Sequence, residues 1–335
     1  MKTVVIILSA LGLSVLAGCN GAARRQGPAV KDREFLTVDF QKPQTLRYKF
    51  VSSRNVELDW DPTKSVSKAA DQKINKSSES MEMVVAYTPV DIDSYGLTTI
   101  KATCESVKAR RSPLKGREKD AVQSLSGKTF TITLGPTGKI EDRSRLKELA
   151  FEVGEKAFRP RSKQGRIKEP DMIGDFIATQ WFLWDSISSI EKASEGVAVG
   201  QSWTSQLSAP TPLLVRRARD VVYTLDEIRE TEKGRLAVIK SVFTPAESVT
   251  REWPLPYSGS FQVAGTFGFM VRFVRGFKVT HLQGQGTELF NIDAGRTEQY
   301  NHQYRMQLDA SAPSPLGIKP RITIEQKLSM QLLGN

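Results

Sequence analysis

Residues 128–142 read KTFTITLGPTGKIED, and this stretch indicates the fold class. Apolar side chains at positions 130, 132 and 134 alternate with threonines, which is the period of two expected for a β-strand with one buried face. The turn sequence Gly135-Pro136-Thr137-Gly138 follows, in which proline presets one φ angle and glycine accepts a positive one. A strand that ends in a tight turn is typical of an antiparallel sheet.

The same alternation recurs along most of the chain. It is visible near 46–50, 56–60, 81–87, 97–107, 221–225, 236–243, 261–308 and 322–330, and a polar loop at 61–78 separates two of these stretches. Helical spacing replaces it at 144–158 and 171–193. We therefore predict a mainly β (α+β) fold, with curved antiparallel sheet plugged by two central helices. A loose similarity between 128–142 and 286–298 allows an alternative organisation. In it the body consists of two related β modules, 44–200 and 201–335, which pack as one unit.

Charge is distributed unevenly. The chain has 335 residues, 39% of them hydrophobic, and a net charge of +11, a composition that excludes intrinsic disorder. Residues 19–170 hold 30 Lys and Arg against 20 Asp and Glu, whereas residues 171–335 hold 17 of each. The excess lies mainly in two predicted loops, 108–119 and 159–168. Either these charges are simply solvated, or the following residues contact an anionic lipid, a glycan or a protein partner: Arg110, Arg111, Lys115, Arg117, Arg159, Arg161, Lys163, Arg166 and Lys168.

The N-terminus carries an export signal. A lysine at position 2 precedes the uncharged run 4–16, which is shorter than the ~20 residues of a membrane-spanning helix. The run ends in Leu16-Ala17-Gly18-Cys19, which closely resembles the lipobox of bacterial lipoproteins. This resemblance implies that residues 1–18 are a signal peptide cleaved after Gly18 and that Cys19 carries acyl chains, which make a stable membrane anchor. An ordinary signal peptide with a coincidental cysteine is the alternative.

The lipobox resemblance also implies a location. The protein would be exported and lipid-anchored, which removes nucleic acid as a partner. Asn20, rather than aspartate, favours the periplasmic side of the outer membrane in a double-membrane bacterium. Residues 19–43 are small, polar and proline-containing, and we predict that they form a flexible tether.

A search for catalytic and metal-binding residues finds no constellation. The chain has two histidines, His281 and His302, too few for the common zinc sites, and we predict that both are exposed or half-buried strand residues. Gly127-Lys128-Thr129 lacks the earlier glycine of a phosphate-binding loop. Asp91 and Asp93 fit turn positions better than a calcium loop. We therefore predict neither a metal nor a cofactor, and no enzymatic activity.

Two further residue types have structural interpretations. Trp181 and Trp184 lie among apolar residues, so core packing is favoured over a sugar-stacking platform. Cys104 has no second cysteine to pair with if Cys19 is acylated, and we predict that it is a buried strand residue.

Parts of the body resemble uncharacterised envelope lipoproteins. The motifs are the strand and turn at 129–140, the sequence Gly200-Gln201-Ser202-Trp203 and the glycine-containing hairpin at 284–296. The architecture is also similar to periplasmic lipoprotein carriers, which hold acyl chains in a half-barrel. We predict a non-enzymatic envelope lipoprotein that binds a hydrophobic or anionic envelope component or supports envelope assembly. The alternatives are a structural lipoprotein that docks a protein partner, and an envelope hydrolase, which would need two carboxyl groups converging in a cleft.

Overall fold

The computed structural model describes residues 33–40, 44–60, 62, 75–112, 120–157, 165–167, 172–205, 209–210, 218–246, 261–263, 275–311 and 319–334. These residues belong to one compact unit, which spans residues 32–335. Cys19 and the residues before it lie outside the described part of the chain, as do Lys115, Arg117, Arg159, Arg161, Lys163 and Lys168.

Long strands make up most of the described chain. They are β1 (Arg33–Glu34), β2 (Leu46–Asp59), β3 (Asn75–Ile92), β4 (Thr98–Ser112), β5 (Thr129–Leu134), β6 (Ile140–Asp142), β7 (Gly165–Ile167), β8 (Val197–Ala198), β9 (Ser202–Thr204), β10 (Ala209–Pro210), β11 (Ala218–Thr231), β12 (Gly234–Pro245), β13 (Phe261–Val263), β14 (Arg275–Asn291), β15 (Arg296–Ser311) and β16 (Arg321–Leu332). The helices are α1 (Ser144–Ala157), α2 (Ile173–Phe182) and α3 (Asp185–Ser188), with 3-10 turns η2 (Ala121–Leu125) and η3 (Ala193–Glu195).

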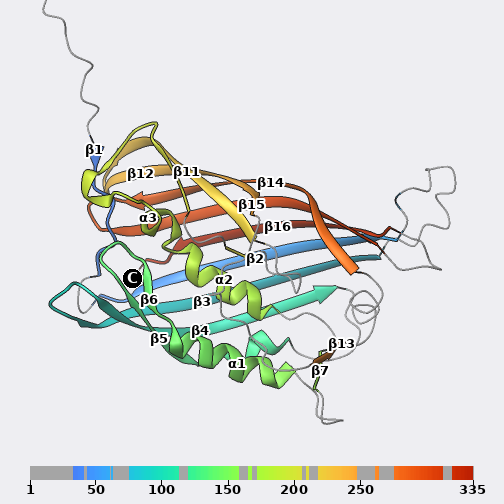
Figure 1. Ribbon diagram of the computed structural model, residues 1–335. Helices are drawn as coiled ribbons and strands as arrows, with labels where there is room; N and C mark the ends of the chain where they lie inside the picture. Colours follow the sequence, from blue (N-terminus) through green and yellow to red (C-terminus); the bar gives the residue numbers. More distant parts are fainter. Residues whose placement is uncertain are drawn as a thin grey trace, which may run out of the picture. The chain divides into compact units, whose positions relative to one another are not determined.

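One antiparallel sheet organises the molecule. It has 12 strands in the order β10-β11-β12-β14-β15-β16-β2-β3-β4-β5-β6, with β9 also paired to β11 (Figure 1). Strand β16 lies between β15 and β2, so the two halves of the chain share a single sheet. The sheet is open over the described residues, with β6 and β10 at its edges. The predicted mainly β, α+β fold class is therefore confirmed.

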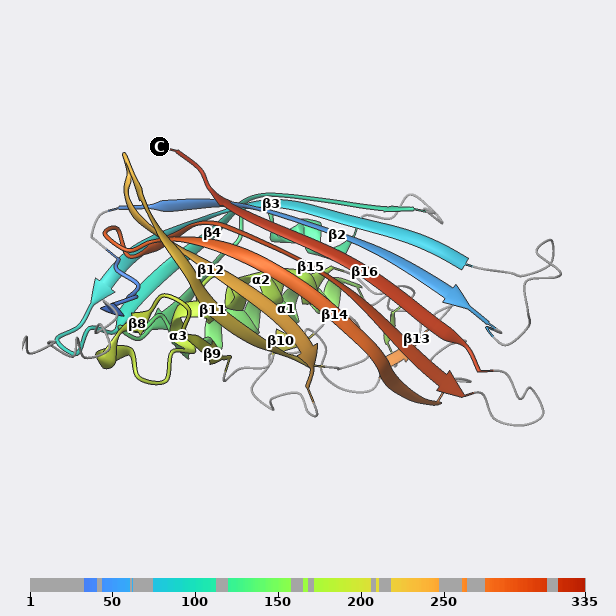
Figure 2. The same ribbon diagram turned by 90° about the horizontal axis from the view of Figure 1, so that it is seen from above.

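Helices α1, α2 and α3 lie against one face of this sheet (Figures 1 and 2). Every residue of α2 except Gly174 is buried. The predicted single helix over 171–193 was wrong, because α2 ends at Phe182 and α3 begins at Asp185. The break lets the Trp184 ring pack edge-on against Tyr87 at a centroid distance of 5.5 Å. An apolar run gives no periodicity from which such a break could be read.

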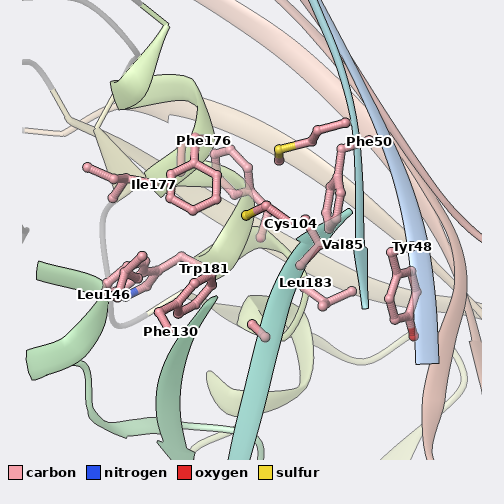
Figure 3. Close-up of a cluster of buried hydrophobic side chains, with 14 of the residues drawn as sticks. Tyr48, Phe50, Val85, Cys104, Phe130, Leu146, Phe176, Ile177, Trp181 and Leu183 are labelled. Carbon is pink, nitrogen blue, oxygen red and sulfur yellow. The ribbon is translucent and has the colours of Figure 1, made fainter. Parts of the chain in front are cut away.

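Two hydrophobic clusters fill the space between helices and sheet. The first joins α1 and α2 to strands β2 to β5, with Phe130 packed edge-on against Phe176 at 5.9 Å and Trp181 close by (Figure 3). The second joins Ile187 of α3 to strands β11, β12 and β14 to β16. Dense packing of this kind leaves the sheet one covered face and one solvent face.

The sheet has two distinct ends. One end carries the turns between β3 and β4, β5 and β6, β11 and β12, and β14 and β15. Residues 33–40 also lie there, since β1 pairs with β8 and the amide of Asp39 donates to the carbonyl of Gly295 at 2.8 Å. We call this the tether end and the opposite one the far end. Leu36 and Phe40 are buried, so the predicted flexible tether over 19–43 extends too far into the body.

Candidate functional site

A row of polar side chains crosses the covered face of the sheet. Five residues on neighbouring strands stand directly opposite one another, namely Arg111, Glu79, Arg54, Gln326 and Tyr304. Partners in register point to the same face of a sheet, so these side chains form a continuous line. We call these five residues, together with Asp175 of α2 above them, the polar row.

The polar row lies between the two hydrophobic clusters. Along β2, Phe50 belongs to the first cluster and Leu58 to the second, and Arg54 stands between them. Along β16, Leu328 belongs to the first cluster and Ile324 to the second, on either side of Gln326. The apolar alternation of each strand is therefore interrupted at one depth in the sheet.

Arg54 is the centre of the row. Its side chain is 1% exposed, and it bridges two carboxylates. Nε donates to Glu79 Oε2 at 2.9 Å and Nη1 donates to Asp175 Oδ2 at 3.1 Å, while Nη2 also contacts Glu79. Burial alone would lower the pKa of Arg54, but Asp175 and Glu79 together raise it. The guanidinium therefore stays charged inside the protein.

Asp175 joins helix α2 to the sheet. Besides Arg54, its carboxylate accepts hydrogen bonds from Gln326 Nε2 at 2.9 Å and from Ser52 Oγ at 3.4 Å. Gln326 in turn accepts from the Tyr304 hydroxyl at 2.7 Å. Burial raises the pKa of Asp175 to about 6, although Arg54 opposes the shift.

The row ends at Arg111, whose side chain is 14% exposed. Arg111 Nη2 lies 2.8 Å from Asp120 Oδ2, and its Nε lies 3.4 Å from Glu79 Oε1. Asp120 Oδ1 accepts the backbone amides of Val122 and Met172. These contacts tie η2 and the start of α2 to β4.

A second buried polar group lies under α3. Asp185 accepts hydrogen bonds from the Tyr223 hydroxyl at 2.7 Å and from Ser205 Oγ at 2.8 Å. Glu288 on β14 accepts from Thr297 Oγ1 at 2.6 Å. Burial raises the pKa of Glu288 to about 7, with nearby Asp185 adding to the shift. Both carboxyl groups are at most 3% exposed, so they lie in the packed interior beside α3 and not in a solvent-filled cleft.

His302 is buried, and the prediction that it is exposed or half-buried was wrong. Its ring packs against Phe182 at 5.0 Å and Phe243 at 5.4 Å, and Nδ1 lies 3.0 Å from the Tyr300 hydroxyl. Gly286 on the neighbouring strand leaves room for the His302 side chain, because a Cβ atom at position 286 would lie only 2.9 Å from the Cβ of His302. His281 is exposed, as predicted.

The predicted anion-contact residues do not lie together in one place. Arg110 is exposed on β4, whereas Arg111 points to the covered face and forms the ion pairs given above. Adjacent strand residues point to opposite faces, so the two arginines cannot share one anion. Arg166 lies in β7, and the other six lie outside the described residues.

Several structural predictions are confirmed. Trp181 and Trp184 are both 5% exposed in the first cluster, and Cys104 is buried on β4. Burial raises the pKa of the Cys104 thiol to about 12. Asp93 is a turn residue whose Oδ1 accepts the amides of Tyr95 and Leu97, whereas Asp91, also predicted in the turn, lies in β3. Sequence reasoning missed Arg54, Glu79 and Asp175, although Arg54 shares the strand phase of Phe50 and Ser52.

A small pocket lies at the tether end between η3 and β9. It encloses about 290 Å³, and its lining includes Arg33, Glu195, Gln201 and Trp203. The Arg33 guanidinium donates to the Gly196 carbonyl and to Gln201 Oε1. Those bonds fix residues 33–34 to the body, which accounts for the polar lining.

Within the described residues, no helix combines the length and the hydropathy that crossing a bilayer requires. The same residues contain no cluster of three or more His, Cys, Asp or Glu side chains arranged to hold a metal ion.

Comparison with known proteins gives no family. No protein-family model matches the chain, and no curated protein is similar to it. Among solved structures, the crystal structure of Pseudomonas aeruginosa OpdQ is similar at a TM-score of 0.20 and 8% identity, over 87% of this chain and 99% of that one. A similarity at that level carries no inference about function.

Proposed function

We propose that this protein is a non-enzymatic, lipid-anchored envelope protein that binds an anionic envelope component at the end of its body remote from the anchor. One observation carries the proposal. Residues 33–40, which lead back toward Cys19, lie at the tether end, whereas β4 leads into residues 113–119 from Ser112 at the far end. An anchor at Cys19 would hold the tether end near the membrane and direct the basic segment away from it.

The packed interior argues for binding by the surface rather than by enclosure. A carrier of acyl chains needs an apolar space between helix and sheet. Here α2 is buried on nearly all sides, and the polar row fixes it to β2 and β16 through Asp175. This arrangement favours an anionic ligand at the surface over a hydrophobic ligand inside.

The anchor is tested with Cys19→Ala in the native, exported protein. We expect the variant to move from the membrane fraction to the soluble fraction, because the acyl chains supply the membrane affinity. Cys104→Ala is the matched control and should stay with the membrane. A Cys19→Ala protein that remains membrane-bound would refute the anchor.

Binding at the far end is tested with the soluble Cys19→Ala protein. Vesicles with 30% phosphatidylglycerol and immobilised lipopolysaccharide are the two probes, which separate a lipid headgroup from a glycan phosphate. Replacing Lys115 and Arg117 by glutamine should weaken binding about tenfold, and added salt should similarly weaken binding by the parent protein. Equal binding by the variant, or no binding to either probe, would contradict an anionic ligand and favour a protein partner.

A further inference from the structure

The turn between β3 and β4 presents apolar side chains to solvent at the tether end. Tyr95 is 84% exposed, Val90 47% and Ile92 40%. Exposed aromatic and β-branched side chains are common singly, but three within six residues at one hairpin tip form a patch. We call Val90, Ile92 and Tyr95 the apolar tip.

The tip is held rigidly. Asp93 Oδ1 accepts the amides of Tyr95 at 2.8 Å and Leu97 at 2.9 Å, and the Asp93 amide donates to the Leu97 carbonyl at 3.0 Å. Gly96 takes a φ of +80° and packs against Pro136 of the neighbouring turn. Tyr95 therefore projects from a fixed turn, which limits the entropy lost when its ring is bound.

The start of the described chain lies at the same end. Val38 contacts Gly138 of the β5–β6 turn, and that turn also touches Gly96 through Pro136. Only residues 20–32 separate Cys19 from β1. The flexible tether predicted from their composition would span about 20 Å on average.

From this placement, we infer that the apolar tip inserts its side chains into the interface of the lipid bilayer that holds the Cys19 anchor. The inference rests on the proposed anchor. Tyrosine is suited to this position because its ring is apolar and its hydroxyl reaches water and headgroups. Asp91 and Asp93 flank the tip, so the contact does not depend on anionic lipid, and salt should leave it unchanged.

The test attaches an environment-sensitive dye to the Tyr95→Cys variant of the full lipidated protein, reconstituted in phosphatidylcholine vesicles. Cys19 is acylated in this protein and Cys104 is buried, so labelling is confined to the new cysteine. Lys76→Cys is the matched control, because it lies on the same strand at the far end with a side chain 71% exposed. We expect a blue-shifted emission quenched by spin-labelled lipid at position 95, and an aqueous emission at position 76.

The outcomes separate the tip from the anchor. Protein that floats with the vesicles while the dye at 95 reports water overturns the bilayer contact and leaves the anchor standing. Protein that does not float refutes both. As a second readout, Tyr95→Ser with Ile92→Ser should double or more the rate at which the lipidated protein exchanges between vesicles, whereas Val242→Ser, an exposed valine on β12, should not. Equal exchange rates would also overturn the contact.

Discussion

At the scale of single residues, buried charge is the most informative feature. Arg54 lies deep between two hydrophobic clusters and is held by two carboxylates from different elements. A buried ion pair adds little net stability compared with apolar packing, but removing one member leaves the other charged and unpaired. The polar row therefore favours one register between β2, β3, β16 and α2 over its alternatives.

Arg54→Met should lower the free energy of unfolding by about 3–5 kcal/mol, because Glu79 and Asp175 would lose their shared cation inside the protein. Urea denaturation of the soluble protein measures this. Arg47 lies on the same strand as Arg54 but pairs with Glu105 of β4 at the surface, so Arg47→Met should have little effect. Similar losses in both variants would show that the buried position of Arg54 is unimportant.

The raised pKa of Glu288 predicts that the stability of the protein depends on pH. Its pKa is about 7 in the folded protein and near 4.5 when unfolded, so the folded state binds more protons between these values. The free energy of unfolding contributed by this group therefore falls as pH rises from about 4.5 to about 7. Glu288→Gln should raise the free energy of unfolding by about 1 kcal/mol at pH 5 and by about 3 kcal/mol at pH 8.

Denaturation at the two pH values checks this prediction. The exposed Glu325→Gln on β16 is the control and should change little at either pH. Equal effects of Glu288→Gln at pH 5 and pH 8 would mean that Glu288 does not carry a raised pKa.

At the scale of elements, two glycines with positive φ angles can be compared, one before β5 and one in the β5–β6 turn. Gly127 and Gly138 both have φ near +80°, a conformation that other residues adopt with strain. They differ in their surroundings. A Cβ atom on Gly127 meets nothing within 4 Å, whereas one on Gly138 would lie 2.7 Å from Val38 Cγ2.

Gly127→Ala should therefore cost about 1 kcal/mol, from backbone strain alone. Gly138→Ala should cost more, because residues 33–40 must also move away from the β5–β6 turn. Thermal unfolding compares the two, and limited proteolysis near Val38 would report the displacement. A smaller loss for Gly138→Ala than for Gly127→Ala would argue against the packing of residues 33–40 on this turn.

At the scale of the whole molecule, one sheet is completed by strands from both ends of the chain. Strand β16 pairs with β2 along twelve residue pairs, Arg321↔Asp59 to Leu332↔Tyr48. The covered face is then closed by α1, α2 and α3, with Cys104 beneath them on β4. The body is expected to unfold cooperatively, since no cluster belongs to one half of the chain alone.

Cys104 reports on that cooperativity. A thiol reagent should leave it unmodified in the native protein, because the thiol is buried with a pKa raised to about 12. Modification should begin only in the denaturant range where circular dichroism shows global unfolding. Tyr95→Cys is the exposed control and should react at once. Fast modification of native Cys104 would reveal local opening of β4.

Local sequence patterns were enough to predict the fold class, the approximate position of α1, the turn role of Asp93 and the burial of Trp181, Trp184 and Cys104. These follow from local periodicity and turn chemistry, which act over a few residues. The predicted lipid anchor at Cys19 is likewise a local motif, and it remains a prediction.

Local patterns could not predict the strand order, the break between α2 and α3, the burial of His302 or the polar row. Each depends on contacts between residues far apart in the chain. Arg54 and Asp175, for instance, are 121 positions apart, and Gln326 lies another 151 beyond Asp175. No local pattern distinguishes a charged residue that faces solvent from one that faces a carboxylate on another element. The alternation of a strand shows which side chains share a face, but what that face contacts depends on the neighbouring elements.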